Sequence, residues 1–432
     1  MSATRVSTAN YIQLVRRNSN FRRLWLAQIV SENGDWFYTL AIYSLLLDLT
    51  GKASSVAGAL VLQVLPITVL GPLAGLVNDR FSRRRVMIAT DLARMVIVAC
   101  MLLVRTREFV WVIYLLLFAE TVMVAFFEPA RTASIPSIVG KDDIIVANTL
   151  SAATWSFDLA IGSVLGGIVA AWLGRDAVFA INALSFGASA LFISRMHFLE
   201  GHTDAAIRHP EDRSAGWPAI RAGYRYIASN PKLAALVCLK GGVSIVGTSW
   251  VLFPVMGMRV YTLPIPGLNP ERAALFGMSL LMGARGIGAL TGPVFSARIA
   301  GNTQSNLRLA VLFGFIIGGI GYVFLGNLQN VWIAVVVIVL AHSGTATVWV
   351  FSTTLLHLHT DDRFRGRVFG AELAISMLVL AAAAFIAGHE IDMGVSPRAV
   401  AVATGLTMAI PAIGWGCAMR LWRTSDCDRH PT

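Results

Sequence analysis

The sequence predicts an all-α membrane protein with twelve transmembrane helices, arranged as two pseudo-symmetric six-helix bundles. First, its 432 residues are 56% hydrophobic and 14% charged, whereas soluble domains carry about 25% charged residues. Second, apolar runs of about 20 residues, the length that crosses a bilayer, recur along the chain. Third, one long polar stretch near the middle divides these runs into six and six.

Each apolar run predicts one helix, and short polar connections join most of the helices. The predicted helices span residues 22–47, 53–78, 85–104, 109–128, 144–172, 176–196, 233–259, 271–297, 307–326, 331–357, 367–388 and 398–420. The N-terminal half is therefore 1–196, and the C-terminal half with a short cytoplasmic tail is 233–432. Between them, 197–232 forms a cytoplasmic loop with an amphipathic surface helix.

The arginines and lysines predict the orientation of these helices, because cytoplasmic loops of membrane proteins are enriched in them. With the N-terminus inside, most basic residues fall in inner segments. The predicted outer segments hold Lys52, Arg105, Arg107, Arg175, Arg259, Arg272 and Arg398. The net charge of +11 thus reflects topology, and it does not indicate a nucleic-acid partner. We expect a multi-pass protein of the bacterial plasma (inner) membrane, with both termini cytoplasmic. The polar, basic first 23 residues do not predict a signal peptide.

A basic stretch, GLVNDRFSRRR at 75–85, joins the second and third predicted helices. It resembles the signature loop of the major facilitator superfamily, Gly-x-Leu-Ala-Asp-Arg-x-Gly-Arg-Arg-Arg. The matching residues are Gly75, Asp79, Arg80, Arg83, Arg84 and Arg85. Ser82 stands where that family has glycine. If the loop needs a left-handed residue there, serine costs about 1 kcal/mol.

Further stretches resemble the drug and siderophore exporters of that superfamily, the enterobactin-exporter-like and macrolide-efflux-like branch. They are NFRRLW at 20–25, LTG at 49–51, EPAR at 128–131, INALSF at 181–186 and RGR at 365–367. The resemblance implies the major facilitator fold and transport by alternating access. The antiporter motif of that superfamily has a proline after a glycine on the fifth helix, and the Gly162-Ser163 pair lacks it.

The resemblance also implies a conformational latch on the inner face. Asp79 would hold the eleventh helix when the inside is closed, and Arg83 would pair with Glu128 at the end of the fourth helix. Such contacts form in one state and break in the other. The latch residues are Gly75, Asp79, Arg80, Arg83, Glu128 and Arg131. Arg84 and Arg85 are as well explained by a role in membrane topology.

Several ionisable residues lie within predicted spans, where each costs about 2.5–3.5 kcal/mol on insertion scales and requires a partner, a wet cavity or a function. The resemblance implies that the first, fourth, seventh and tenth helices line the central cavity. The candidate proton-coupling and substrate-cavity residues are Glu32, Asp35, Glu120, Asp158, Lys240, Arg285 and His342. Glu32 and Asp35, three residues apart, share a helix face. Two close carboxylates cannot both ionise easily in a low-dielectric cavity, which suits a proton carrier.

Each of these residues has a structural alternative. Lys240 can reach the inner interface by snorkelling. Arg285 can bind Asp158 or a backbone carbonyl across the halves, and His342 can form an interhelical hydrogen bond. Glu120 is left open between function and structure. Asp91 and Arg94, which share a face of the third helix, are expected to satisfy each other or the signature loop.

The sequence favours a secondary active transporter, a proton-coupled exporter of small organic molecules of the drug or siderophore class. We expect a monomer in the lipid bilayer that binds a small-molecule substrate and protons, without cofactor or metal. No ATP-binding loop or catalytic constellation is present in the sequence, so it does not predict an enzyme. Two alternatives remain: a lipid or lysolipid translocator of the same fold, and a membrane sensor that no longer transports.

Overall fold

The computed structural model describes residues 8–140, 143–197, 217–261, 263–301, 303–361 and 364–427. Within the helices, the side chains at 8–10, 68, 71–72, 75–76, 79, 217–220 and 421–427 are not described. Most of the central loop and the side chain of the predicted latch residue Asp79 therefore lie outside the described residues. Of the predicted latch residue Gly75, only the helical backbone is described.

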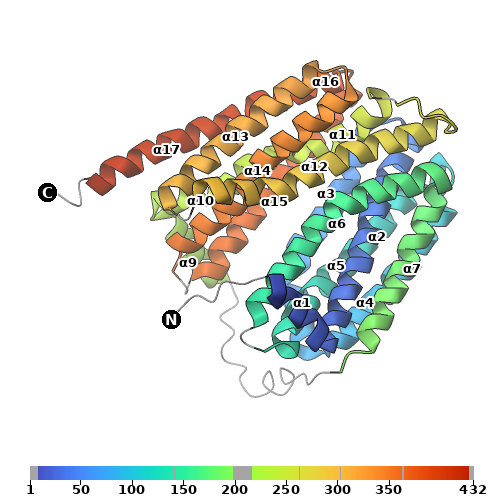
Figure 1. Cartoon of the computed structure of the whole chain (residues 1–432), viewed down its shortest axis with the longest axis horizontal. Coiled ribbons are helices and arrows are strands. Elements are labelled where there is room, and N and C mark those ends of the chain that lie inside the picture. The colour runs from blue at the N-terminus through green and yellow to red at the C-terminus, as the bar shows by residue number, and fades with distance from the viewer. Residues whose placement is uncertain are drawn as a thin grey trace. The chain divides into compact units, whose positions relative to one another are not determined.

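The described residues are helical almost throughout, as the sequence predicts (Figure 1). The helices up to the central loop are α1 (Thr8–Arg17), α2 (Ser19–Thr50), α3 (Ala53–Arg80), α4 (Arg83–Cys100), α5 (Val110–Ile138), α6 (Ile144–Leu173) and α7 (Arg175–Ser194). The later helices are α9 (Trp217–Ala228), α10 (Pro231–Val243), α11 (Ser249–Arg259), α12 (Pro270–Ala300), α13 (Gln304–Asn327), α14 (Val331–His359), α15 (Arg365–Asp392), α16 (Pro397–Thr407) and α17 (Ala409–Cys427).

Ten helical segments of the described chain are long and apolar enough to cross a membrane. The apolar part of α3, Ala53–Ile67, is shorter, and α2 is not among the ten. The middle of α2 carries Glu32, Asn33 and Asp35, which lower its hydropathy. The all-α membrane class is thus confirmed, while the number of twelve spans stays a prediction.

The fourth predicted helix is longer than expected. It was predicted to end at residue 128, but α5 continues to Ile138 with Pro129 and Pro136 inside it. A proline leaves one backbone carbonyl without its helical partner, and apolar surroundings tolerate this where local groups compensate. Pro129 and Pro136 leave the carbonyls of Ala125 and Thr132 without a helical N–H partner, and the side chains of Thr132 and Ser134 donate to the nearby carbonyls of Glu128 and Ala130. The EPAR stretch therefore lies within a helix and not after one.

Two other predicted helices are interrupted. A 3-10 segment, Ser244–Thr248, separates α10 from α11. Met408 separates α16 from α17, with Pro411 in the first turn of α17. Met408 keeps a helical φ of −64° and ψ of −15°, and its N–H donates to the Thr404 carbonyl at 3.2 Å. Residues Pro397–Arg420 therefore still form one apolar span, and both helices pack against α13.

The described part of the chain forms two compact units. The first contains residues 1–50, 62–212 and 264–279, and the second contains 51–61, 213–263 and 280–432. The start of α3 therefore packs with the second unit, and the start of α12 packs with the first. The predicted division at the central loop into uninterrupted halves stays a prediction.

In the first unit, α2 packs against α6 and α7, and α4 packs against α5 and α7. Gly34 permits the close contact of α2 with α7, because a Cβ there would lie 2.3 Å from Asn182 Oδ1. Buried apolar side chains including Phe21, Met87 and Phe127 fill one end of the unit. The resulting close packing fixes which side chains of α2, α4 and α5 face one another.

In the second unit, α13 packs against α14, α16 and α17, and α10 packs against α14 and α15. Gly314 and Gly344 mark the closest approach of α13 and α14. A Cβ on Gly314 would lie 2.6 Å from the Gly344 carbonyl oxygen, and the reverse distance is 2.7 Å. Small residues at helix crossings are typical of membrane bundles, where close packing contributes much of the attraction between helices.

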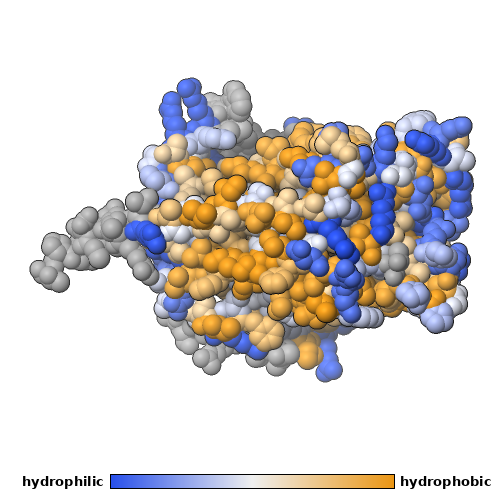
Figure 2. All heavy atoms as spheres, turned by 90° about the horizontal axis from the view of Figure 1, so that it is seen from above, coloured by the Kyte–Doolittle hydropathy of each residue, from blue (hydrophilic) through white to orange (hydrophobic). Residues whose placement is uncertain are grey.

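Large apolar side chains remain exposed on many helices, among them Leu184, Leu378, Ile410 and Ile413 at 67–71% exposure. Figure 2 shows a broad area of apolar side chains (orange), with hydrophilic side chains (blue) more frequent towards the two ends of the view. A soluble protein rarely exposes so much apolar surface. This surface is suited to contact with lipid acyl chains.

Candidate transport site and conformational contacts

Arg94 lies at the centre of an acidic cluster in the first unit. Its side chain, on α4, is 4% exposed and contacts three carboxylates. Its Nη2 atom donates to both Asp35 oxygens at 2.9 and 2.8 Å, and its Nε atom donates to Glu120 at 2.8 Å. Asp91 lies 3.9 Å from Nη1. One guanidinium thus joins acids from α2, α4 and α5.

The rest of the cluster is closely packed. The Arg94 guanidinium carbon lies 3.9 Å from the centroid of the Phe186 ring, and Ser189 donates to Asp91 at 2.6 Å. Asp91 and Glu120 are almost completely buried, whereas the Asp35 side chain is 33% exposed. Asp35 is therefore the most accessible carboxylate of the three.

Asp91 and Arg94 form the expected ion pair, at 3.9 Å, but it is not the shortest contact of Arg94. Arg94 lies 2.8 Å from oxygens of Asp35 and Glu120. The helical spacing of Asp91 and Arg94 correctly places them on one face. It could not show that this face is turned towards α2 and α5, because that depends on tertiary packing.

Glu32 and Asp158 form a second acidic group in the first unit. Asn33 donates to Asp158 at 2.6 Å, and Gln28 donates to Glu32 at 3.0 Å. The Asn33–Asp158 contact joins α2 to α6, and these two helices pack against each other.

Gln28 connects this group to residues predicted for the latch. Arg131 donates to the Gln28 side-chain oxygen at 3.0 Å and forms an ion pair with Glu128 at 2.8 Å. A continuous chain of polar contacts therefore runs from Glu128 through Arg131 and Gln28 to Glu32. The predicted latch and cavity residues are linked here in a way that the sequence did not indicate.

The loop before α4 ends at a serine that caps the helix. Ser82 has φ −58° and ψ 117°, and its hydroxyl accepts from the Arg85 N–H as the N-cap of α4. No left-handed residue is needed, so the strain considered for serine at this position does not arise. Serine is among the preferred N-cap residues, whereas glycine has no capping side chain.

The loop arginines contact helix carbonyls in the first unit. Arg83 donates to the Ala133 carbonyl at 2.7 Å, and Arg84 donates to the carbonyls of Ile193 and Ser194 at the end of α7. A cation at a helix C-terminus complements the helix dipole. Arg84 therefore has a contact beyond its role in topology, while the Arg83–Glu128 pairing stays a prediction. Arg80 is exposed at the end of α3.

The second unit holds a buried ion pair between α10 and α15. The Lys240 ammonium lies 3.0 Å from Glu372, with the two side chains 8% and 1% exposed. It also lies 4.8 Å from the Trp349 ring centroid. Ser244 and Ser376, one turn further along the same helices, share a hydrogen bond of 2.6 Å. The snorkelling alternative for Lys240 is thus not what the structure shows.

His342 and Arg285 each contact aromatic side chains within the second unit. His342 Nε2 lies 3.0 Å from the Tyr322 hydroxyl, and its ring packs against Phe253. This is the interhelical hydrogen bond weighed as an alternative for His342. The Arg285 guanidinium carbon lies 3.9 Å from the centroid of the Trp250 ring. Asp158 belongs to the other unit, so the suggested Arg285–Asp158 contact stays untested.

The sequence reasoning missed several members of these groups. Arg94 was treated as structural, and Gln28, Asn33, Tyr322 and Trp250 were not considered. The cost of burying a charge was the signal that could have singled out Arg94, because an arginine inside a span needs partners and its own helix face offers only one. Neutral Gln28 and Asn33 carry no comparable signal.

Comparison with known proteins identifies the family of this membrane protein. The model of the transmembrane secretion effector family, a major facilitator group, matches residues 15–430. The chain belongs to this family. It is therefore a membrane transporter of the major facilitator superfamily and not an enzyme.

Relatives of this transmembrane secretion effector include efflux proteins. The MFS-type transporter YfiS of Bacillus subtilis is 25% identical over 83% of each chain. Macrolide efflux protein A of Streptococcus pyogenes is 27% identical over 38% of this chain and 41% of that protein. The putative bacilysin exporter BacE of Bacillus subtilis is 30% identical over 32% and 35%.

Solved transporters share the fold of this transmembrane secretion effector. The nucleoside transporter NupG superimposes with a TM-score of 0.70 at 13% identity, covering 92% of this chain and 98% of NupG. A bacterial homologue of the human lysosomal transporter Spinster gives 0.68 at 14% identity, covering 96% and 98%. At these identities the likeness establishes the fold alone.

Proposed function

We propose that this major facilitator transporter is a proton-coupled exporter of small organic molecules, working by alternating access. The observation that supports this most directly is the Arg94 cluster, in which one guanidinium faces Asp35, Glu120 and Asp91. One positive charge cannot balance three ionised carboxylates, and uncompensated charge is costly in a low-dielectric site. A proton on one carboxylate reduces that imbalance.

Asp35 is the carboxylate best placed to exchange this proton. It is 33% exposed, whereas Arg94 is 4% exposed and both Glu120 and Asp91 are buried. Protonation of Asp35 neutralises one acceptor of the bidentate contact, and Arg94 keeps its contact with Glu120. Loss of the proton restores the Asp35–Arg94 ion pair. The two protonation states therefore differ in how tightly α2 is held to α4, which is the kind of bias that coupling requires.

The names of the relatives support export as the direction of transport. Macrolide efflux protein A and the putative bacilysin exporter BacE are named for the efflux of macrolides and the export of bacilysin. We place the transporter as a monomer in the bacterial plasma membrane, with cytoplasmic termini and a substrate of the drug or siderophore class. Glu32, Asp158, Lys240, Arg285 and His342 are assigned to the proposed cavity and coupling machinery, where their buried polar contacts hold the helices in register.

Asp35→Asn tests the proposed coupling role. We expect the variant in proteoliposomes to lose substrate flux driven by an imposed proton gradient, because an amide cannot carry the proton. Substrate binding and substrate exchange without a gradient should survive. Radiolabelled or fluorescent substrates from a growth-inhibition panel provide the measurement.

Asp176→Asn is the matched control for this experiment. It removes the same charge, but Asp176, on α7, is exposed and forms an ion pair with Arg105. Its driven flux should equal that of the unaltered protein. Normal driven flux in Asp35→Asn would remove Asp35 from the coupling step. Movement of labelled lysolipid, or substrate binding without any flux, would favour the translocator or the sensor instead.

A further inference from the structure

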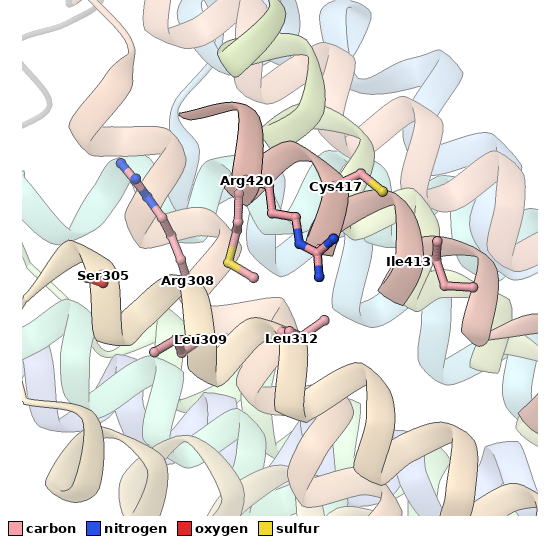
Figure 3. Close-up of a pocket in the computed structure, with 9 residues that line it drawn as sticks. Ser305, Arg308, Leu309, Leu312, Ile413, Cys417 and Arg420 are labelled. Atoms are coloured by element: carbon pink, nitrogen blue, oxygen red, sulfur yellow. The ribbon is translucent and has the colours of Figure 1, made fainter. Parts of the chain in front are cut away.

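A pocket between α13 and α17 combines basic and apolar side chains. It has a volume of about 430 Å³ and is lined by Arg308, Arg420, Ser305 and Cys417, together with apolar residues such as Leu309 and Met419. In Figure 3 the Arg420 side chain reaches from α17 into the space above Leu312, while the Arg308 side chain extends from α13 in a different direction. Both arginines belong to the second unit, whereas the carboxylate clusters around Arg94 and Glu32 belong to the first.

A longer apolar groove continues from this pocket. Leu312 and Ile413 line both, and the groove of about 640 Å³ runs on past Ile316 and Ile320 between α13 and the α16–α17 pair. Its exposed walls are apolar: Ile320 is 52% exposed and Ile413 is 67% exposed. A pocket with charged residues at one end and an apolar groove leading from it matches the two parts of a phospholipid.

Close contacts between helices shape the groove and the pocket. A Cβ on Gly405 would lie 2.4 Å from the Gly319 carbonyl oxygen, so α13 and α16 nearly touch there. Beyond Met408, α17 continues the same apolar span. Towards the basic end, Trp415 Nε1 of α17 donates to the Arg308 carbonyl at 3.0 Å and so joins α17 to α13 beside the pocket. The pocket is thus built by the fold.

The distribution of basic residues predicts that the arginine end lies on the cytoplasmic side. Arg308 and Arg420 fall in two of the predicted inner segments. Basic pockets between transmembrane helices on this side bind anionic lipid headgroups. We propose that the pocket between α13 and α17 binds one anionic phospholipid, with its phosphate at Arg308 and Arg420 and an acyl chain along the groove past Leu312 and Ile413.

Direct binding of phosphatidylglycerol tests this assignment. Native mass spectrometry of the purified full chain should show tighter binding of phosphatidylglycerol than of phosphatidylcholine. Each arginine near an anionic surface contributes about fivefold, so Arg308→Gln with Arg420→Gln should weaken phosphatidylglycerol binding about thirty-fold. Arg420→Gln alone, at an exposed position that is safe for folding, should weaken it about fivefold.

Arg298→Gln is the matched control. It removes one charge at the exposed cytoplasmic end of α12 but does not line the pocket, so phosphatidylglycerol binding should stay unchanged. Equal binding of the two lipids would overturn the proposal, as would full binding by the double variant or equal weakening by Arg298→Gln. Competition by glycerol phosphate at the same concentration would also overturn it, since this would show a site for a free phosphate and not for a lipid.

Two native cysteines give a position-specific readout. Cys417 is exposed and lines the pocket, whereas Cys238 is exposed on α10 and does not. Phosphatidylglycerol should slow maleimide labelling of Cys417, measured by peptide mass spectrometry, without slowing that of Cys238. The double arginine variant should lose this protection. Equal protection of both cysteines would show nonspecific coverage by lipid and would contradict a specific site.

Discussion

At the scale of single residues, buried charges in this transporter occur with partners from other helices. Arg94 on α4 joins Asp35 on α2 and Glu120 on α5, and Lys240 on α10 joins Glu372 on α15. A buried charge whose partner is removed loses its compensation, which costs about 3–5 kcal/mol. Each of these ion pairs therefore joins helices that are far apart in the sequence. A shift of one helix would break its ion pair with the other.

The Lys240–Glu372 pair offers a direct test of this dependence. Lys240→Met should lower the free energy of unfolding by about 3–5 kcal/mol, because Glu372 is then buried without its cation. The double variant Lys240→Met with Glu372→Gln should recover most of the loss. Thermal or denaturant unfolding of the detergent-purified variants gives the coupling energy by a double-mutant cycle. Equal loss in the single and double variants would mean that the pair does not act as a unit.

At the scale of helices, close crossings depend on glycine. Gly314 on α13 and Gly344 on α14 each approach the carbonyl of the other, so neither position has room for a Cβ without backbone movement. By contrast, a Cβ at Gly370 on α15 would meet nothing within 4 Å. Glycine is therefore required at the α13–α14 crossing but not at position 370 of α15, and the amino-acid sequence does not distinguish these two kinds of position.

Alanine substitutions at these glycines should have opposite effects. Gly344→Ala should destabilise the protein by about 1–3 kcal/mol, because α13 and α14 must separate. Gly370→Ala should leave stability unchanged or raise it by about 0.5–1 kcal/mol, since alanine favours the helical backbone. Thermal unfolding in one detergent compares the two variants. A Gly344→Ala protein as stable as Gly370→Ala would show that the α13–α14 crossing is not tight.

At the scale of the whole molecule, the two compact units do not follow the order of the chain. The start of α3 packs in the second unit, where Asp392 of α15 accepts from the N–H groups of Ala53 and Ser54 at 2.7 and 3.0 Å. Residues 264–279 pack in the first unit, where Glu271 pairs with Arg175 at 2.7 Å. Two segments thus contribute to units other than those of their neighbours in sequence.

Membrane topology is tested on the whole chain. A green fluorescent protein fused after Thr432 should fluoresce in a bacterial host, because the basic residues predict a cytoplasmic C-terminus. Alkaline phosphatase fused after Gly394, in the predicted outer connection between α15 and α16, should be active, since this enzyme requires an oxidising compartment. The reverse pattern would invert the topology and would move the proposed lipid site to the other leaflet.

The sequence predicted the fold better than it predicted the contacts of the candidate site. The apolar runs predicted the helices, and the motifs predicted the family, because both depend on short stretches of chain. Helix ends were less predictable: Pro129 favoured a boundary, but α5 continues to Ile138. Helical spacing placed Asp91 and Arg94 on one face and left open which neighbouring helix that face contacts.

The sequence by itself thus determined that the chain is a helical membrane transporter, and which ionisable residues need an explanation inside the bilayer. Tertiary structure alone decided that Arg94 contacts Asp35 and Glu120, and that Arg308 and Arg420 border one pocket. The physical reason is one of range. Hydropathy and helical periodicity act over a few turns of a single helix, whereas an ion pair or a pocket requires two helices whose relative rotation is set by packing.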